Sequence, residues 1–103
     1  MPQRQPFTAV RGIVHVPVTP FTADNEVDPD TFARVVAFLL RQQASSLCVN
    51  LHLAESLNLT LDERKSLAKA AVDVAAGRVR VIVHVSTPGT DQAIELAHHA
   101  EQI

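Results

Sequence analysis

The side chain best suited to chemistry in this chain is His52, which lies in a short loop between an apolar run and a helix start. The apolar run, residues 46–50, predicts a strand, and residues 59–64 predict the beginning of a helix. In parallel α/β folds, the loops that follow the strands carry the binding and catalytic groups. An imidazole at such a place can donate to a carboxylate or act as an acid or base near neutral pH. An ordinary surface histidine is the alternative interpretation.

Two further polar residues occupy comparable positions. Glu55 ends the same loop, and we expect it mainly to hydrogen-bond loop amides and so to hold the loop. Thr19 follows the first predicted strand, where its hydroxyl would either reach a site or cap a backbone group. The sequence does not choose between these two roles for Thr19.

The histidines raise the question of a metal site. His15, His52 and His84 each belong to a different predicted strand or its end, and three imidazoles could form a trigonal site. Their spacing is not a local ligand motif, and His15 and His84 precede the strand ends, so we expect no metal. His98 and His99 are adjacent on a predicted helix and face different directions, so we expect surface or packing roles for them.

Strand and helix patterns alternate along the chain. Apolar, β-branched runs predict strands over residues 12–18, 46–50 and 79–85, with the first strand buried on both sides and interrupted or ended at Pro17. The spacing of about 30 residues is that of a βα crossover unit, which implies parallel strands and right-handed crossovers. A βαβαβα series fits a small open sheet or the opening of a longer barrel equally well.

Each predicted helix begins at a capping signal. Asp28 and Pro29 are the N-cap and first residue of a helix that should end near residue 43. Thr60 and Glu63 form a capping box for a helix that reaches about residue 76. Thr90 is expected to cap the third helix. The apolar faces predicted to turn inward are Phe32, Val35, Val36, Leu39 and Leu40; Leu67, Ala68, Ala71, Val74 and Ala75; and Ala93, Ala97 and Ala100.

Composition indicates one folded domain of 103 residues, with 47% apolar and 19% charged residues. The net charge of −2 gives no electrostatic reason to expect nucleic acid or an anionic membrane as a partner. Cys48 is the only cysteine, so no intrachain disulfide can form and a buried thiol is expected. We expect residues 1–11 to be a loosely held leader without a secretory signal, residues 12–103 to be the folded part, and the location to be cytoplasmic.

Three stretches resemble one enzyme family. Residues 18–21 read Val-Thr-Pro-Phe, residues 55–64 contain Glu-Ser and then Leu-Thr-Leu-Asp-Glu-Arg, and residues 77–97 match in pattern a third unit. In this order and spacing, they resemble the dihydrodipicolinate synthase and N-acetylneuraminate lyase family over residues 12–103. The resemblance implies an α/β fold with parallel strands, corresponding to the first three of eight β/α units of a TIM (β/α)8 barrel.

The same resemblance carries expectations about activity. It implies a class I aldolase or lyase that acts on pyruvate-like 2-oxo acids through a Schiff base, assembles as a homotetramer and uses no metal or organic cofactor. The family's Schiff-base lysine and relay tyrosine lie on later strands, so no catalytic residue is expected within this chain. The sequence contains no tyrosine, and its only lysines, Lys65 and Lys69, fall on the outer face of a predicted helix.

The chain departs from the family at its signature loop. The family sequence is Gly-Thr-Thr-Gly-Glu, and here residues 51–55 read Leu-His-Leu-Ala-Glu. Leu53 keeps a backbone amide for a substrate carboxylate but lacks the hydroxyl, whereas His52 supplies a new donor. The expected substrate-binding residues are therefore His52, Leu53, Thr19 and Glu55. Two interpretations remain: a divergent aldolase or lyase, and an inactive relative or fragment that binds a small acid or serves in assembly.

Overall fold

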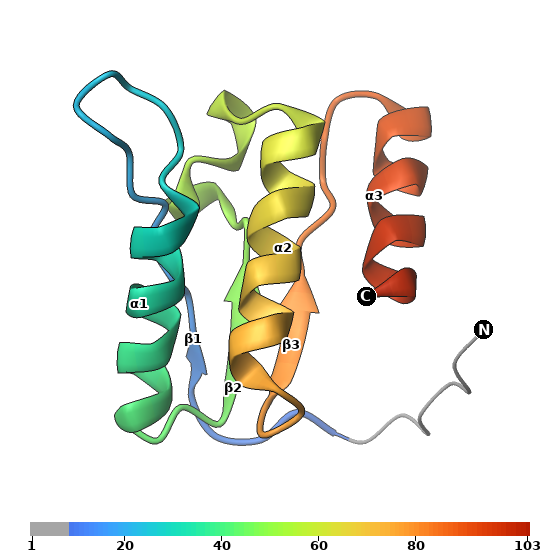
Figure 1. The fold of residues 1–103 in the computed structure, drawn as a ribbon. Coiled ribbons are helices and arrows are strands. Elements are labelled where there is room, and N and C mark those ends of the chain that lie inside the picture. The colour runs from blue at the N-terminus through green and yellow to red at the C-terminus, as the bar shows by residue number, and fades with distance from the viewer. Residues whose placement is uncertain (1–8) are drawn as a thin grey trace.

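The computed structural model describes residues 9–103, so most of the predicted leader lies outside the described residues. Helices and strands alternate, and the strands pair in parallel in the order β1-β2-β3 (Figure 1). The elements are β1 (Val14–His15), α1 (Pro29–Arg41), β2 (Ser46–Val49), the short 3-10 helices η1 (His52–Ala54) and η2 (Ser56–Asn58), α2 (Leu61–Ala75), β3 (Arg80–Val83) and α3 (Thr90–Gln102). The predicted βαβαβα order is confirmed.

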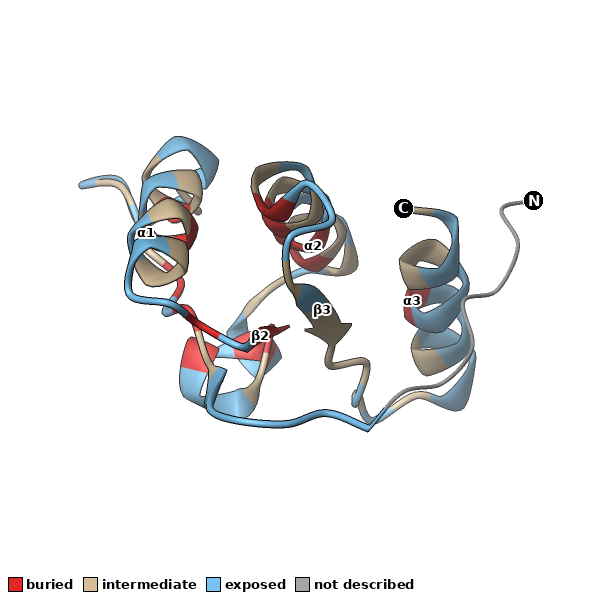
Figure 2. Ribbon diagram, turned by 90° about the horizontal axis from the view of Figure 1, so that it is seen from below, coloured by how far each residue is buried: buried red, intermediate tan, exposed pale blue. Residues whose placement is uncertain are grey.

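The helices form one layer in the same order as the strands, with α1 and α2 in front of the sheet in Figure 1. The core lies between this layer and β2, where the buried residues gather (Figure 2). All four residues of β2 are buried because strands flank it and helices cover it. The fully buried core side chains include Phe32, Val36, Leu47, Val49, Leu67 and Ala71. No helix of the described part of the chain is long and apolar enough to cross a membrane.

The first strand is much shorter than predicted. Only Val14 and His15 pair with β2, and the flanking Ile13 and Val18 are 70% and 60% exposed. The expectation of a strand over residues 12–18 buried on both sides is therefore wrong. Pro17 has no amide hydrogen for the ladder, and β1 is an edge strand with a neighbour on one side only.

Helix α1 begins as predicted, at an Asp28 N-cap. The carboxylate of Asp28 accepts hydrogen bonds from the amide of Thr31 at 3.1 Å and from its hydroxyl at 2.8 Å. Phe32 and Val36 are buried on the inward stripe, and the helix ends at Arg41, two residues before the predicted end. The observed cap and apolar stripe agree with the prediction because both depend only on residues that are close in the sequence.

The capping box of α2 is also confirmed. The amide of Thr60 donates to the Glu63 carboxylate at 2.8 Å, and the amide of Glu63 donates to the Thr60 hydroxyl at 3.1 Å. The helix ends where Ala76 and Gly77 both adopt a positive φ, of 49° and 77°. Gly77 tolerates this left-handed conformation without steric cost, as expected for a residue just after a helix.

Helix α3 differs from prediction in two respects. Its N-cap is Gly89, and Thr90 is the first helical residue and provides no side-chain cap. The buried residue is Leu96, whereas Ala97, predicted to face inward, is exposed. Helix α3 packs against the rest of the described chain mainly through α2.

The two threonines provide a matched test of helix capping. Thr60→Ala should lower the free energy of unfolding by about 0.5–2 kcal/mol because it removes the hydroxyl that accepts from the amide of Glu63 at the start of α2. Thr90→Ala should change it by less than about 0.5 kcal/mol because the Thr90 hydroxyl caps nothing. Urea unfolding followed by circular dichroism measures both. Equal losses in the two variants would contradict the assigned caps.

Candidate functional site

The loop after β2, called the site loop below, lies at the carboxyl ends of the strands and contains the two 3-10 helices η1 and η2. Asn50 and Glu55, which flank η1, have positive φ values of 63° and 62°. The loop therefore makes two left-handed turns without the glycines that best tolerate them. The Asn50 side chain supports the first turn by donating to the carbonyl of Arg64 at 2.9 Å.

Thr19 holds this loop against the end of β1. Its hydroxyl donates to the carbonyl of Ala54 at 2.6 Å, and the residue is only 7% exposed. Of the two roles left open by the sequence, the structure places Thr19 in the backbone-capping one. The bond joins residues 35 positions apart and fixes η1 relative to the first strand.

The side chains of Glu55 and Leu53 are more exposed than that of Thr19. The Glu55 side chain is exposed, and its carboxylate forms no hydrogen bond with a loop amide in the described residues, so the expected loop-holding role is not observed. Instead, Thr19, Asn50 and backbone bonds within η1 hold the loop. The Leu53 side chain is 79% exposed and is available only as part of the loop surface.

His52 is exposed and lies beside a second histidine. The imidazole rings of His52 and His84 are 5.1 Å apart between centroids and inclined at 78°. The sequence placed His84 inside the third strand, but β3 ends at Val83, and the amide of His84 donates to the carbonyl of Val49 at 3.0 Å. Both imidazoles therefore stand at the carboxyl ends of neighbouring strands. His15 does not join them: no group of three potential metal ligands occurs within residues 9–103.

Burial lowers the pKa of His84, and the nearby charges of His52 and Arg64 act in the same direction. The carbonyl of Asn50 opposes them by favouring the protonated ring. The net effect keeps His84 neutral at physiological pH, where the ordinary imidazole pKa is already below 7. Its Nδ1 is buried without a hydrogen-bond partner in the described chain.

Sequence reasoning missed Arg64, which is buried at 2% exposure in α2. Its guanidinium donates to the carbonyl of His84 at 2.8 Å and to that of Ser86 at 2.9 Å, so it ties α2 to the loop after β3. Burial lowers the pKa of the guanidinium. The only sequence signal was its position one turn after the helix cap, which also fits a solvated surface arginine.

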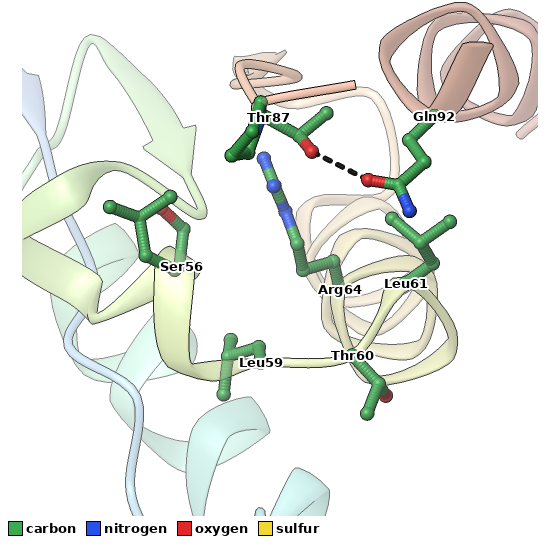
Figure 3. A pocket seen from close by; sticks show the side chains of 9 residues that line it. Ser56, Leu59, Thr60, Leu61, Arg64, Thr87 and Gln92 are labelled. Carbon is green, nitrogen blue, oxygen red and sulfur yellow. Dashed lines mark hydrogen bonds between the residues drawn. The ribbon is translucent and has the colours of Figure 1, made fainter. Parts of the chain in front are cut away.

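A pocket of about 230 Å³ opens beside Arg64, between the start of α2 and the loop after β3 (Figure 3). The hydroxyl of Thr87 donates to the side-chain oxygen of Gln92 at 2.9 Å across its rim. Nε of Arg64 and the hydroxyl of Ser56 are buried without partners among the described residues. The lining is Ser56, Leu57, Leu59, Thr60, Leu61, Arg64, Thr87, Pro88 and Gln92.

Comparison with known proteins identifies the family. Residues 9–103 match the dihydrodipicolinate synthetase family, and the chain belongs to it. The chain is 37% identical over 90 residues to a 4-hydroxy-tetrahydrodipicolinate synthase of Salinibacter ruber, and 37% identical over 94 residues to an N-acetylneuraminate lyase of Danio rerio. These alignments cover 87% and 89% of this chain. The resemblance deduced from the sequence is therefore confirmed.

Solved structures of relatives confirm the fold. A prophage protein of E. coli K12, a member of the dihydrodipicolinic acid synthase family solved in complex with pyruvate, superposes with a TM-score of 0.83 at 31% identity. The match covers 88% of this chain and 30% of that protein. The chain likewise spans about 30% of the length of the curated relatives it matches, in their N-terminal part. The three parallel β/α units thus correspond to the beginning of the family's barrel.

The bond from Thr19 to Ala54 gives a prediction for the site loop. Thr19→Val should lower the free energy of unfolding by about 1–3 kcal/mol because it leaves a buried carbonyl without its donor. Thr90→Val makes the same chemical change at an exposed residue that caps nothing and should cost less than about 0.5 kcal/mol. Urea unfolding of the two variants measures the difference, and a Thr19→Val protein as stable as the control would contradict the assigned bond.

Proposed function

We propose that this chain is the N-terminal part of a divergent class I aldolase or lyase that acts on a pyruvate-like 2-oxo acid. The observation that supports it most directly is the match of all three β/α units to a family with a member solved in complex with pyruvate. By the resemblance, a lysine on a later strand forms the Schiff base, which serves as an electron sink for making or breaking a carbon–carbon bond.

The lysines of this chain support a nucleophile elsewhere. Lys65 pairs with Glu95 at 3.2 Å, and Lys69 pairs with Asp73 one turn along the same helix. Both belong to α2, which lies on the helical layer, while the site loop lies at the carboxyl ends of the strands. Each ammonium group is thus engaged by a carboxylate on the helical layer and not directed at the site loop. We therefore assign no catalytic residue within residues 1–103.

The site loop would bind the substrate acid. His52 presents an exposed imidazole that can donate to the substrate carboxylate. The backbone amide of Leu53 would be the second donor to this carboxylate. Thr19 contributes by fixing the loop through Ala54. Glu55 completes the proposed set; its side chain is exposed, and its backbone is in the left-handed conformation at the end of η1.

The proposal extends to assembly and location. The family resemblance favours a homo-oligomer, with a tetramer as the expected form, and a reaction without an organic cofactor. The sheet edges and the exposed Ile13, Val18 and Leu57 leave apolar surface that further chain or further subunits would cover. A single buried free thiol, Cys48, suits a reducing cytoplasm.

A second candidate function is a relative without turnover that binds a small acid or serves in assembly. The observation that favours it is the loop itself, in which only Glu55 remains of the family's five residues. In that case the acid would bind without forming a covalent intermediate.

Borohydride trapping separates the two functions. The naturally made polypeptide that carries this sequence is incubated with pyruvate and borohydride in buffer containing EDTA, and its mass is measured. A class I enzyme gives one reduced adduct per chain, because the iminium is converted to a stable amine. Binding of pyruvate without an adduct would overturn the proposed enzyme and support the second candidate.

The same assay tests the role of His52. His52→Ala should raise the pyruvate concentration needed for half-maximal trapping by about tenfold, as expected for loss of one hydrogen bond to a charged group. His98→Ala, which removes an exposed imidazole on α3, is the matched control and should leave this concentration unchanged. An unchanged value in His52→Ala would show that the imidazole does not contact the acid.

A further inference from the structure

The imidazole of His52, the proposed donor to the substrate carboxylate, is exposed at the start of η1. Its side chain forms no hydrogen bond with any residue of the described part of the chain. An exposed side chain without such a bond samples several rotamers, and a ligand that needs one of them must select it at a cost in affinity. The contact that orients this ring is the one with the imidazole of His84.

The two rings meet edge to face. Their centroids are 5.1 Å apart and their planes are inclined at 78°. Aromatic rings favour this nearly perpendicular arrangement because the positive edge of one ring faces the negative face of the other. Such a contact changes an equilibrium by about threefold to tenfold. It therefore favours one orientation of the His52 ring over the others by a measurable amount.

His84 is the fixed member of this pair. Its amide donates to the carbonyl of Val49 at 3.0 Å, and its carbonyl accepts from the guanidinium of Arg64 at 2.8 Å. These bonds tie its backbone to β2 and α2, and its ring is half-buried, with Nδ1 out of contact with solvent. The exposed ring of His52 therefore adapts to the ring of His84, and the reverse does not occur.

The charge of His84 supports this role. Burial lowers the pKa of its imidazole, and the nearby charges of His52 and Arg64 act in the same direction. His84 is therefore neutral at physiological pH and places no second charge against the ring of His52. A neutral neighbour leaves His52 able to carry the proton that it would donate to a carboxylate.

We propose that His84 is a positioning residue for the substrate acid, and that its anchored ring holds the imidazole of His52 in the orientation that meets the carboxylate. His84 acts through His52 and does not itself contact the acid. The inference rests on the proposed function in one respect, because it takes His52 as a donor to the acid. It does not require the Schiff base, since the acid binds before any covalent step.

The test is equilibrium binding of pyruvate to the natural polypeptide that carries this sequence, measured by calorimetry. His84→Phe keeps an aromatic ring at the contact, whereas His84→Leu fills the same space without one. We expect the dissociation constant of pyruvate to rise about threefold to tenfold in His84→Leu, and His84→Phe to restore it to within about twofold of the unaltered value. Equal dissociation constants in the two variants would overturn the proposal.

A second background separates positioning from a general structural effect. In polypeptide that also carries His52→Ala, the Phe and Leu variants of His84 should bind pyruvate equally, because the ring through which His84 acts is gone. A difference that persists there would show that His84 acts by another route. The control is His98→Leu, which removes an exposed imidazole from α3 and should leave the dissociation constant unchanged.

A further measurement needs no variant and does not depend on how the variants fold. A nuclear Overhauser effect between the ring hydrogens of His52 and His84 is expected in the unaltered natural polypeptide without pyruvate, and its absence would contradict the contact. Borohydride trapping is independent of both tests. A missing adduct beside different affinities in the Phe and Leu variants sinks only the enzyme, an adduct beside equal affinities sinks only the positioning role, and no binding of pyruvate sinks both.

Discussion

The candidate site depends on one buried cation, the guanidinium of Arg64. It donates to two carbonyls of the loop after β3, and the carbonyl of Arg64 itself accepts from Asn50 in the loop after β2. One residue thus connects α2 with the loops that follow two strands. Carbonyl oxygens take the place of a carboxylate for two donors of this buried charge, while its Nε has no partner among the described residues. These bonds hold the backbone of His84 and Ser86 beside the pocket that Arg64 lines.

The three-stranded sheet has one face that the helices cover and one face that is open. The helices and β2 enclose the core, whereas β1 pairs with one neighbour only and much of its surroundings is exposed. Parallel strands are stable when both faces are covered, as in a closed barrel. The open face fits the finding that this chain corresponds to about 30% of each relative, since in those proteins further units follow.

Features that depend on neighbouring residues could be predicted from the sequence. The Asp28 cap and the capping box of Thr60 and Glu63 follow from residues three positions apart, and the buried strand over β2 follows from a continuous apolar run. Prediction was wrong where a distant partner decides the outcome. The length of β1 is limited by an edge position. At α3 the error is one of a single residue, because the helix begins at Thr90 and Gly89 is its N-cap.

The site was predictable in location but not in detail. A loop after a parallel strand identified His52, whereas its contact with His84 depends on the register between β2 and β3, which a single sequence does not specify. For Thr19 the sequence leaves two roles open, and the structure shows its hydroxyl bonded to the carbonyl of Ala54. Arg64 was missed because a buried arginine and a surface arginine look alike one turn after a helix cap.

The most direct test of the proposed enzyme is the intact mass of the natural protein that contains this sequence. We expect a mass about three times the 11.2 kDa of these 103 residues, because the chain covers about 30% of its relatives and the Schiff-base lysine is assigned to a later strand. A mass equal to that of the 103 residues would contradict the enzyme proposed here, since no lysine suited to the Schiff base would then be present.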